Sequence, residues 1–112
     1  MNGTFFAETI KILEYNGKKL EDLKFGILSN NNQYLNKTED DTGYFTISDF
    51  IANSNFVYDD GYGGNEINMS IKLIGKDFWL ERHEYDGSEW WEYKSMPKKP
   101  KNHLKTINFK VE

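Results

Sequence analysis

Residues 78–96, FWLERHEYDGSEWWEYKSM, constrain the fold of this chain more than any other segment. Two runs rich in aromatic residues flank Asp86 and Gly87, a pair that favours a tight turn between antiparallel strands. Before them, residues 67–73 alternate apolar and polar side chains, which is the period of a half-buried strand. Gly75 supplies a turn between the two segments. The sequence therefore predicts a three-stranded meander.

The register of this hairpin follows from its charges. A four-residue loop over 86–89 places Glu81 opposite Lys94 and His83 opposite Glu92, so that charges of opposite sign pair across the strands. A two-residue loop places Glu81 opposite Glu92, which is unfavourable. We therefore predict the four-residue loop. The pattern leaves open which face of the hairpin is exposed.

The N-terminal half is expected to add strands. Residues 4–15 and 25–29 are predicted as strands, and Asn16-Gly17 favours a hairpin turn between them. Residues 18–25 fit either a helix or a strand. Residues 29–43 are rich in Asn and Asp, which indicates a long loop or a weak edge hairpin.

The remaining segments complete the predicted fold. Residues 44–47 are predicted as a strand, and Ser48 is expected to cap one or two turns of helix after it. Residues 59–66 form a glycine-rich loop. The prolines at 97 and 100 break the chain before a closing strand at 107–111, in which Ile107, Phe109 and Val111 alternate with polar residues.

Composition agrees with a β-rich domain. The 112 residues fit a single domain, 1–112, and 16% are aromatic, which suits strands. We predict a mainly β fold, with α+β possible: an antiparallel sheet or small β-sandwich of about six or seven strands with one short helix.

The absence of cysteine excludes disulfides, thiolate metal sites and cysteine nucleophiles. The first residues resemble no signal peptide, and no apolar run approaches the ~20 residues of a membrane span. We therefore expect a cytoplasmic protein without membrane contact.

Charge is unevenly distributed along the chain. Residues 39–92 hold thirteen acidic and three basic residues, a net charge of −10, whereas residues 98–112 have a net charge of +4. An acidic surface repels nucleic acid and attracts basic partners. Acidic loops also keep a small domain soluble, so the sequence leaves a functional and a solubilising interpretation open.

The candidate partner-binding residues combine these acids with aromatic side chains, because exposed Trp and Tyr commonly anchor interfaces. The alternative is that both tryptophans belong to the core. The candidates are Asp59, Asp60, Glu81, Glu84, Tyr85, Asp86, Glu89, Trp90, Trp91, Glu92 and Tyr93.

Catalytic and metal chemistry find little support. Paired carboxylates can hydrolyse glycosidic bonds, but a chain of this size leaves little room for a deep cleft, and we assign no catalytic residue. His83 lacks a convincing set of metal-ligand partners. Asp59, Asp60, Asn65 and Glu66 do not have the spacing of an EF-hand loop. We therefore expect no metal and no cofactor.

These observations favour a non-enzymatic inhibitor of a basic protein: a toxin immunity protein, or a phage- or plasmid-encoded inhibitor that imitates nucleic-acid charge to block a nuclease or a defence protein. The alternatives are a carbohydrate-binding β-sandwich module and a minor structural or assembly protein of a phage or mobile element. The oligomeric state stays open, a dimer included.

Overall fold

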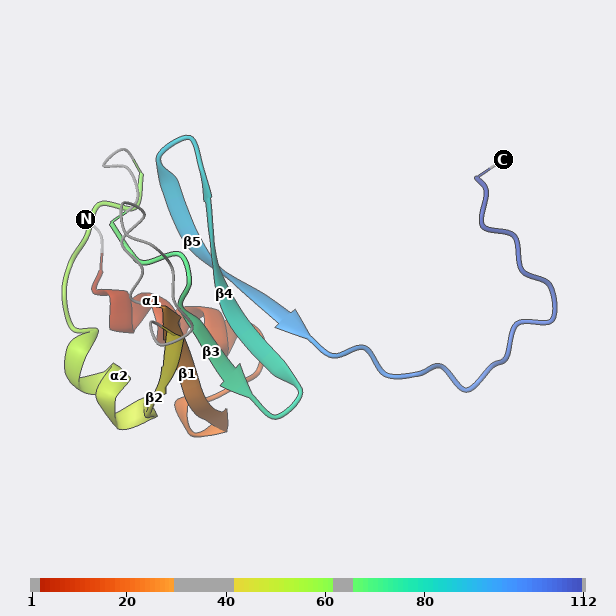
Figure 1. Ribbon diagram of the computed structural model, residues 1–112, viewed down its shortest axis with the longest axis horizontal. Coiled ribbons are helices and arrows are strands. Elements are labelled where there is room, and N and C mark those ends of the chain that lie inside the picture. The colour runs from red at the N-terminus through yellow and green to blue at the C-terminus, as the bar shows by residue number, and fades with distance from the viewer. Residues whose placement is uncertain (1–2, 30–41, 62–65, 112) are drawn as a thin grey trace.

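One antiparallel sheet organises the protein. The computed structural model describes residues 3–29, 42–61 and 66–111. The strands are β1 (Leu23–Ser29), β2 (Thr42–Phe45), β3 (Lys72–Gly75), β4 (Phe78–Tyr85) and β5 (Ser88–Ser95), in the spatial order β2-β1-β3-β4-β5. Helices α1 (Phe5–Tyr15) and α2 (Ile47–Asn53) cover one face, which we call the inner face (Figure 1). Among the described residues, no element covers the opposite, outer face.

The mainly β, antiparallel prediction is therefore confirmed in its coarse form. Every neighbouring pair of strands is antiparallel. The described ranges contain five strands in one open sheet, and neither a sixth strand nor a second, sandwiching sheet is found in them.

The prediction of a strand at residues 4–15 is wrong, because this segment forms α1. Thr4 caps the helix by accepting a hydrogen bond from the Ala7 amide at 3.0 Å. Phe5, Thr9 and Leu13 lie one helical turn apart and are buried on the sheet. Thr9 concealed this period in the sequence, since it is a polar residue inside the core.

Asn16-Gly17 ends α1 and does not form a hairpin turn. Gly17 has a φ of +71°, and the amides of Gly17 and Lys18 donate to the carbonyls of Glu14 and Leu13 at 3.0 and 2.8 Å. This is the usual glycine-containing helix terminus. A short 3-10 helix, η1 (Leu20–Asp22), then leads into β1, which resolves the ambiguity over 18–25.

The predicted strand at 44–47 and the short helix after it are confirmed with shifted ends. β2 ends at Phe45, and Thr46 caps α2 in place of Ser48. Thr46 and Asp49 cap each other, each side chain accepting a 3.0 Å hydrogen bond from the other residue's amide. Most of the predicted loop at 29–43 lies outside the described residues.

The core lies between the inner face and the two helices. Leu13, Leu73 and Leu80 are fully buried at its centre. Gly26 on β1 is covered by the ring of Phe45, and a Cβ at this position would lie only 2.0 Å from that ring. The glycine therefore lets an aromatic ring lie flat on the sheet.

The predicted strand at 67–73 is largely wrong, since β3 begins at Lys72. Side chains satisfy the backbone before it: the Glu89 carboxylate accepts from the amides of Glu66 and Ile67, and Asn68 Oδ1 accepts from the Ser70 amide. These bonds hold an irregular segment in place of a ladder.

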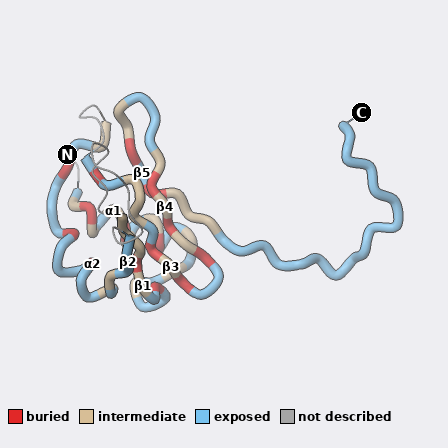
Figure 2. The backbone as a smooth tube through the Cα atoms, viewed as in Figure 1, coloured by how far each residue is buried: buried red, intermediate tan, exposed pale blue. Residues whose placement is uncertain are grey.

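The predicted closing strand at 107–111 is not observed. After Ser95 the chain leaves the body as an extended tail (Figure 1). Residues 96–111 are exposed throughout, as Figure 2 shows by the continuous pale blue of this segment. Phe109 and Val111 are 94% and 99% exposed. We call residues 96–111 the C-terminal tail.

Candidate binding surface on the β4–β5 hairpin

The β4–β5 hairpin has a two-residue turn, so the predicted four-residue loop is wrong. Asp86 and Gly87 both have positive φ, 51° and 85°, which matches the twist of the flanking strands. Tyr85 pairs with Ser88, and Glu81 therefore stands opposite Glu92. The turn chemistry outweighs the repulsion between these two carboxylates, because neighbouring side chains compensate their charges.

Several side chains of the hairpin lie on the outer face. We call six of them the outer cluster: Trp79, Glu81, His83, Trp90, Glu92 and Lys94. His83 Nε2 lies between the two carboxylates, 3.0 Å from Glu81 Oε2 and 3.3 Å from Glu92 Oε2. Lys94 Nζ lies 3.1 Å from Glu92 Oε2. The like-charged pair is thus bridged by basic groups.

Both tryptophans of the outer cluster donate to a carboxylate. Trp79 Nε1 donates to Glu81 Oε1 at 2.7 Å, and Trp90 Nε1 donates to Glu92 Oε1 at 3.4 Å. The Trp79 bond is the main cause that lowers the pKa of Glu81. For Glu92, the hydrogen bond from Lys94 is the main cause of a lowered pKa, and Trp90 adds to it. Both carboxylates therefore stay ionised at neutral pH.

The inner face of the same hairpin carries a second charged group, which we call the buried network: Glu8, Tyr58, Arg82 and Glu89. Arg82 lies 3.2 Å from Glu8 Oε1 and 3.1 Å from Glu89 Oε1, and it donates to the Tyr58 hydroxyl at 3.0 Å. The Tyr58 hydroxyl donates a short hydrogen bond to Glu8. Burial, followed by this bond to Glu8, raises the pKa of Tyr58.

Two predicted binding residues belong to the interior, which corrects their assignment to a partner surface. Glu89 is 2% exposed and Trp91 is 4% exposed. Trp91 Nε1 donates to Thr9 Oγ1 at 2.8 Å, and its ring stacks on Phe5. With a two-residue turn, both side chains point inward, where Glu89 bonds Arg82. Neither side chain is part of the outer face of the hairpin.

The other candidates divide between the outer face, the tip and the sheet edge. Tyr93 is half-buried, because its ring stacks on Phe78. Exposed candidates at the tip are Glu84, Tyr85 and Asp86. The loop containing Asp59 and Asp60 lies beside this tip, since the Asp60 carbonyl accepts from the Glu89 amide at 2.9 Å. The structure therefore brings Glu84, Asp86 and Asp60 to one end of the hairpin.

Sequence reasoning placed His83 and Lys94 on one side of the hairpin with Glu81 and Glu92, but it did not include Trp79, His83 or Lys94 among the partner-binding residues. The missing information was which face of the hairpin is exposed. Strict alternation places all three on the face of Glu81 and Glu92 in the predicted register and in the observed one, and the two helices cover the opposite face. In the described ranges, no group of three or more acidic or histidine side chains is arranged to hold a metal ion.

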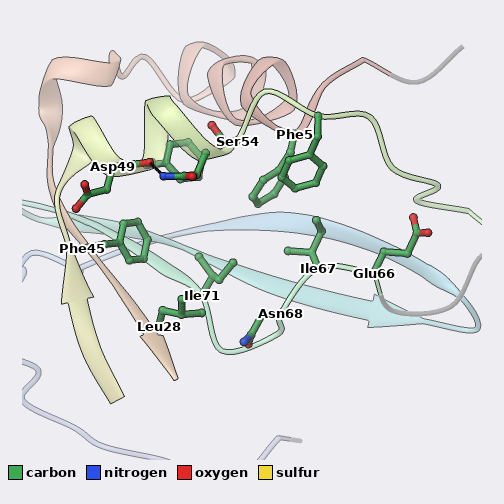
Figure 3. Close-up of a pocket in the computed structure, with 12 residues that line it drawn as sticks. Phe5, Leu28, Phe45, Asp49, Ser54, Glu66, Ile67, Asn68 and Ile71 are labelled. Carbon is green, nitrogen blue, oxygen red and sulfur yellow. Dashed lines mark hydrogen bonds between the residues drawn. The ribbon is translucent and has the colours of Figure 1, made fainter. Parts of the chain in front are cut away.

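A separate cavity of about 340 Å³ lies beneath α2 (Figure 3). Its wall is apolar and includes four phenylalanines: Phe5, Phe45, Phe50 and Phe56. Three polar side chains at its rim serve local structure, whereas the buried Ser54 Oγ in its wall has no hydrogen-bond partner among the described residues. Asp49 caps α2, Glu66 accepts from the Asp59 amide, and Asn68 donates to the Ser29 carbonyl. The cavity therefore offers a mainly apolar surface.

Comparison with known proteins adds no functional assignment. No protein-family model matches the chain, and no curated protein and no solved structure matches it significantly. No helix in the described part of the chain is long and apolar enough to cross a membrane. The candidate surface must therefore be judged on its own geometry.

Proposed function

We propose that this chain is a non-enzymatic binding protein that presents the outer face and the tip of the β4–β5 hairpin to a basic protein. The observation that carries the proposal is the outer cluster. Two ionised carboxylates, Glu81 and Glu92, lie side by side between Trp79 and Trp90 on a sheet face that no described element covers. Acidic groups beside aromatic rings are suited to arginine and lysine side chains.

The hairpin tip extends this surface. Glu84, Asp86 and Asp60 add acidic groups at one end, and Tyr85 adds an exposed ring. Lys94 and His83 are the competing bases within the cluster, so a partner's guanidinium would displace them from Glu92. Long-range attraction between acidic and basic surfaces accelerates association.

The partner class follows from this charge. A toxin or nuclease carries a basic surface where it holds nucleic acid, and an acidic protein that covers that surface inhibits it. We therefore propose a stoichiometric inhibitor, such as an immunity protein or a phage- or plasmid-encoded inhibitor, which acts in the cytoplasm.

The test combines capture with charge reversal. The immobilised chain is used to isolate basic proteins from a lysate of the source cells, and the association rate of the captured partner is then measured at rising salt. We expect the rate to fall steeply with salt, and the variant with Glu81, Glu84 and Glu92 each changed to Lys to lose binding while keeping its circular dichroism spectrum.

A matched control changes the same amount of charge elsewhere. Glu14, Glu21 and Asp77 are exposed acids on α1, η1 and the β3–β4 turn, away from the outer cluster. Changing these three to Lys should leave most of the affinity. Equal loss in both triple variants would show that only net charge matters, and unchanged affinity in the hairpin variant would contradict the proposed surface.

A second candidate function is carbohydrate binding, which is favoured by one specific feature. Trp79 and Trp90 share the outer face with Glu81 and Glu92, and aromatic rings beside carboxylates also suit sugar rings. Binding to a glycan array that hardly responds to salt, and that is lost in Trp90→Ala, would favour this function over the inhibitor.

A further inference from the structure

The edge of the sheet at β5 is open. In an antiparallel hairpin, alternate residues direct their amides to the neighbouring strand and away from it. Because Tyr85 and Ser88 close the turn, the amides of Glu89, Trp91 and Tyr93 point away from β4. The Glu89 amide donates to the Asp60 carbonyl. Among the described residues, the amides of Trp91 and Tyr93 have no backbone carbonyl to bond on this side.

A groove runs beside this open edge. It has a volume of about 330 Å³ and lies between α1 and β5, with Ile12 and Tyr15 on the helix and Trp90 and Trp91 on the strand. Tyr15 is 87% exposed and Trp90 is 37% exposed. A strand added to β5 would bond the free amides and direct every second side chain into this groove, the usual geometry of strand addition.

The C-terminal tail has the sequence that such a site requires. Ile107, Phe109 and Val111 alternate with Thr106, Asn108 and Lys110, so an added strand would have one apolar and one polar face. All three apolar residues are exposed. The net charge of residues 98–112 is +4, whereas residues 39–92, which include β5, have a net charge of −10. The tail therefore has the alternation that an added strand requires, and its net charge is opposite in sign to that of residues 39–92.

The tail is directed away from the open edge of its own sheet. The Met96 amide donates to the Asp77 carbonyl at 2.7 Å, which holds the start of the tail on the β4 side of β5. Pro97 and Pro100 then favour an extended chain. In Figure 1 this segment continues away from the sheet. From Met96, the eight residues up to Leu104 span up to about 26 Å, which is enough to reach another molecule.

We propose that residues 104–111 of one copy add as a sixth strand to the β5 edge of a second copy, with Ile107 and Phe109 in the groove against Ile12 and Tyr15. The exchange is reciprocal, since each copy has one tail and one open edge, and a twofold pair satisfies both. This assembly covers an unpaired strand edge and the exposed apolar side chains of the tail together. Apart from Trp90, which belongs to both, it uses a different surface from the outer cluster.

The test uses the full chain and a spin label. Since the chain has no cysteine, Thr106→Cys gives a single attachment point. Protein that carries the nitroxide but no ¹⁵N is mixed with ¹⁵N-labelled protein that carries no nitroxide. Any broadening of the amide signals then arises between copies. We expect broadening at the amides of Tyr15, Trp91 and Tyr93. Absence of broadening at these amides would overturn the proposal, as would broadening seen only when label and isotope share one chain.

A pair of variants tests the apolar face. Ile107→Ser with Phe109→Ser should raise the dissociation constant of the pair by about a hundredfold, measured by analytical ultracentrifugation. Thr106→Ser with Asn108→Ser alters the polar face of the same segment and should change the dissociation constant less than threefold. A chain that stays monomeric at millimolar concentration, or equal effects of the two variants, would contradict the proposal.

Discussion

The two faces of the β4–β5 hairpin use the same residue types for different purposes. Each face has a glutamate, a basic group and a tryptophan from the same two strands. On the inner face, the side chains of Arg82 and Glu89 are fully buried. On the outer face, the side chains of His83 and Glu92 are 37% and 34% exposed. The difference arises from the alternation of side chains along a strand.

Burial changes what an ion pair does for the protein. The buried network must satisfy every charge within the fold, because an unpaired buried charge is strongly destabilising. The outer pairs stay in contact with water, where an ion pair contributes little to stability. The inner face therefore fixes the hairpin on α1, and the outer face stays available for a partner.

The largest expected effect comes from Arg82→Met. This change leaves Glu89 and Glu8 without their basic partner, and we expect a loss of about 3–5 kcal/mol in the free energy of unfolding. Urea denaturation measures it. Lys94→Met removes an outer base and serves as the control, with an expected change below about 1 kcal/mol. Equal losses would remove the distinction between the faces.

A smaller effect is expected for Trp91→Phe. The change removes the donor to Thr9 Oγ1 and part of a ring that lies 4.9 Å from the Arg82 guanidinium. We expect a loss of about 1–3 kcal/mol in thermal or urea unfolding. Trp90→Phe on the outer face should cost less than half as much, and the reverse order would contradict the assigned faces.

The smallest effect is the pH dependence of the outer cluster. The pKa values of Glu81 and Glu92 are lowered from 4.5, so each stabilises the fold fully above pH 4.5 and loses this contribution as the pH falls through its folded value. Changing both residues to Gln should reduce the slope of unfolding free energy against pH in this acidic range. Asp49, whose pKa is also lowered by the Thr46 amide, keeps part of the slope. An unchanged slope in the double variant would refute this contribution.

The strands of the hairpin were predictable from sequence, but their register was not. Aromatic runs around Asp86 and Gly87 predict two strands and a turn, which the structure contains. The predicted register relied on charge pairing. It failed because turn geometry dominates, and because His83 Nε2 lies within hydrogen-bond distance of both Glu81 and Glu92. Pairwise charge rules do not include such a third group.

The helix α1 and the buried network were not predictable for a related reason. Thr9 is a polar residue, yet its hydroxyl donates a hydrogen bond to the Phe5 carbonyl and accepts one from Trp91 Nε1. These two hydrogen bonds allow it to be buried in the core. Glu8 and Glu89 are distant in sequence and meet only through Arg82. Tertiary contacts of this kind leave no local pattern in the sequence from which they could be predicted.

One comparison tests the central claim, that the inner face of the hairpin stabilises the fold while the outer face serves binding. Glu89→Gln and Glu92→Gln are the same substitution three residues apart on β5. Glu89 accepts from Arg82 and from the amides of Glu66 and Ile67 inside the core. Urea unfolding should show a loss of about 2–4 kcal/mol for Glu89→Gln and less than about 1 kcal/mol for Glu92→Gln. Equal losses, or a larger loss for Glu92→Gln, would contradict the account.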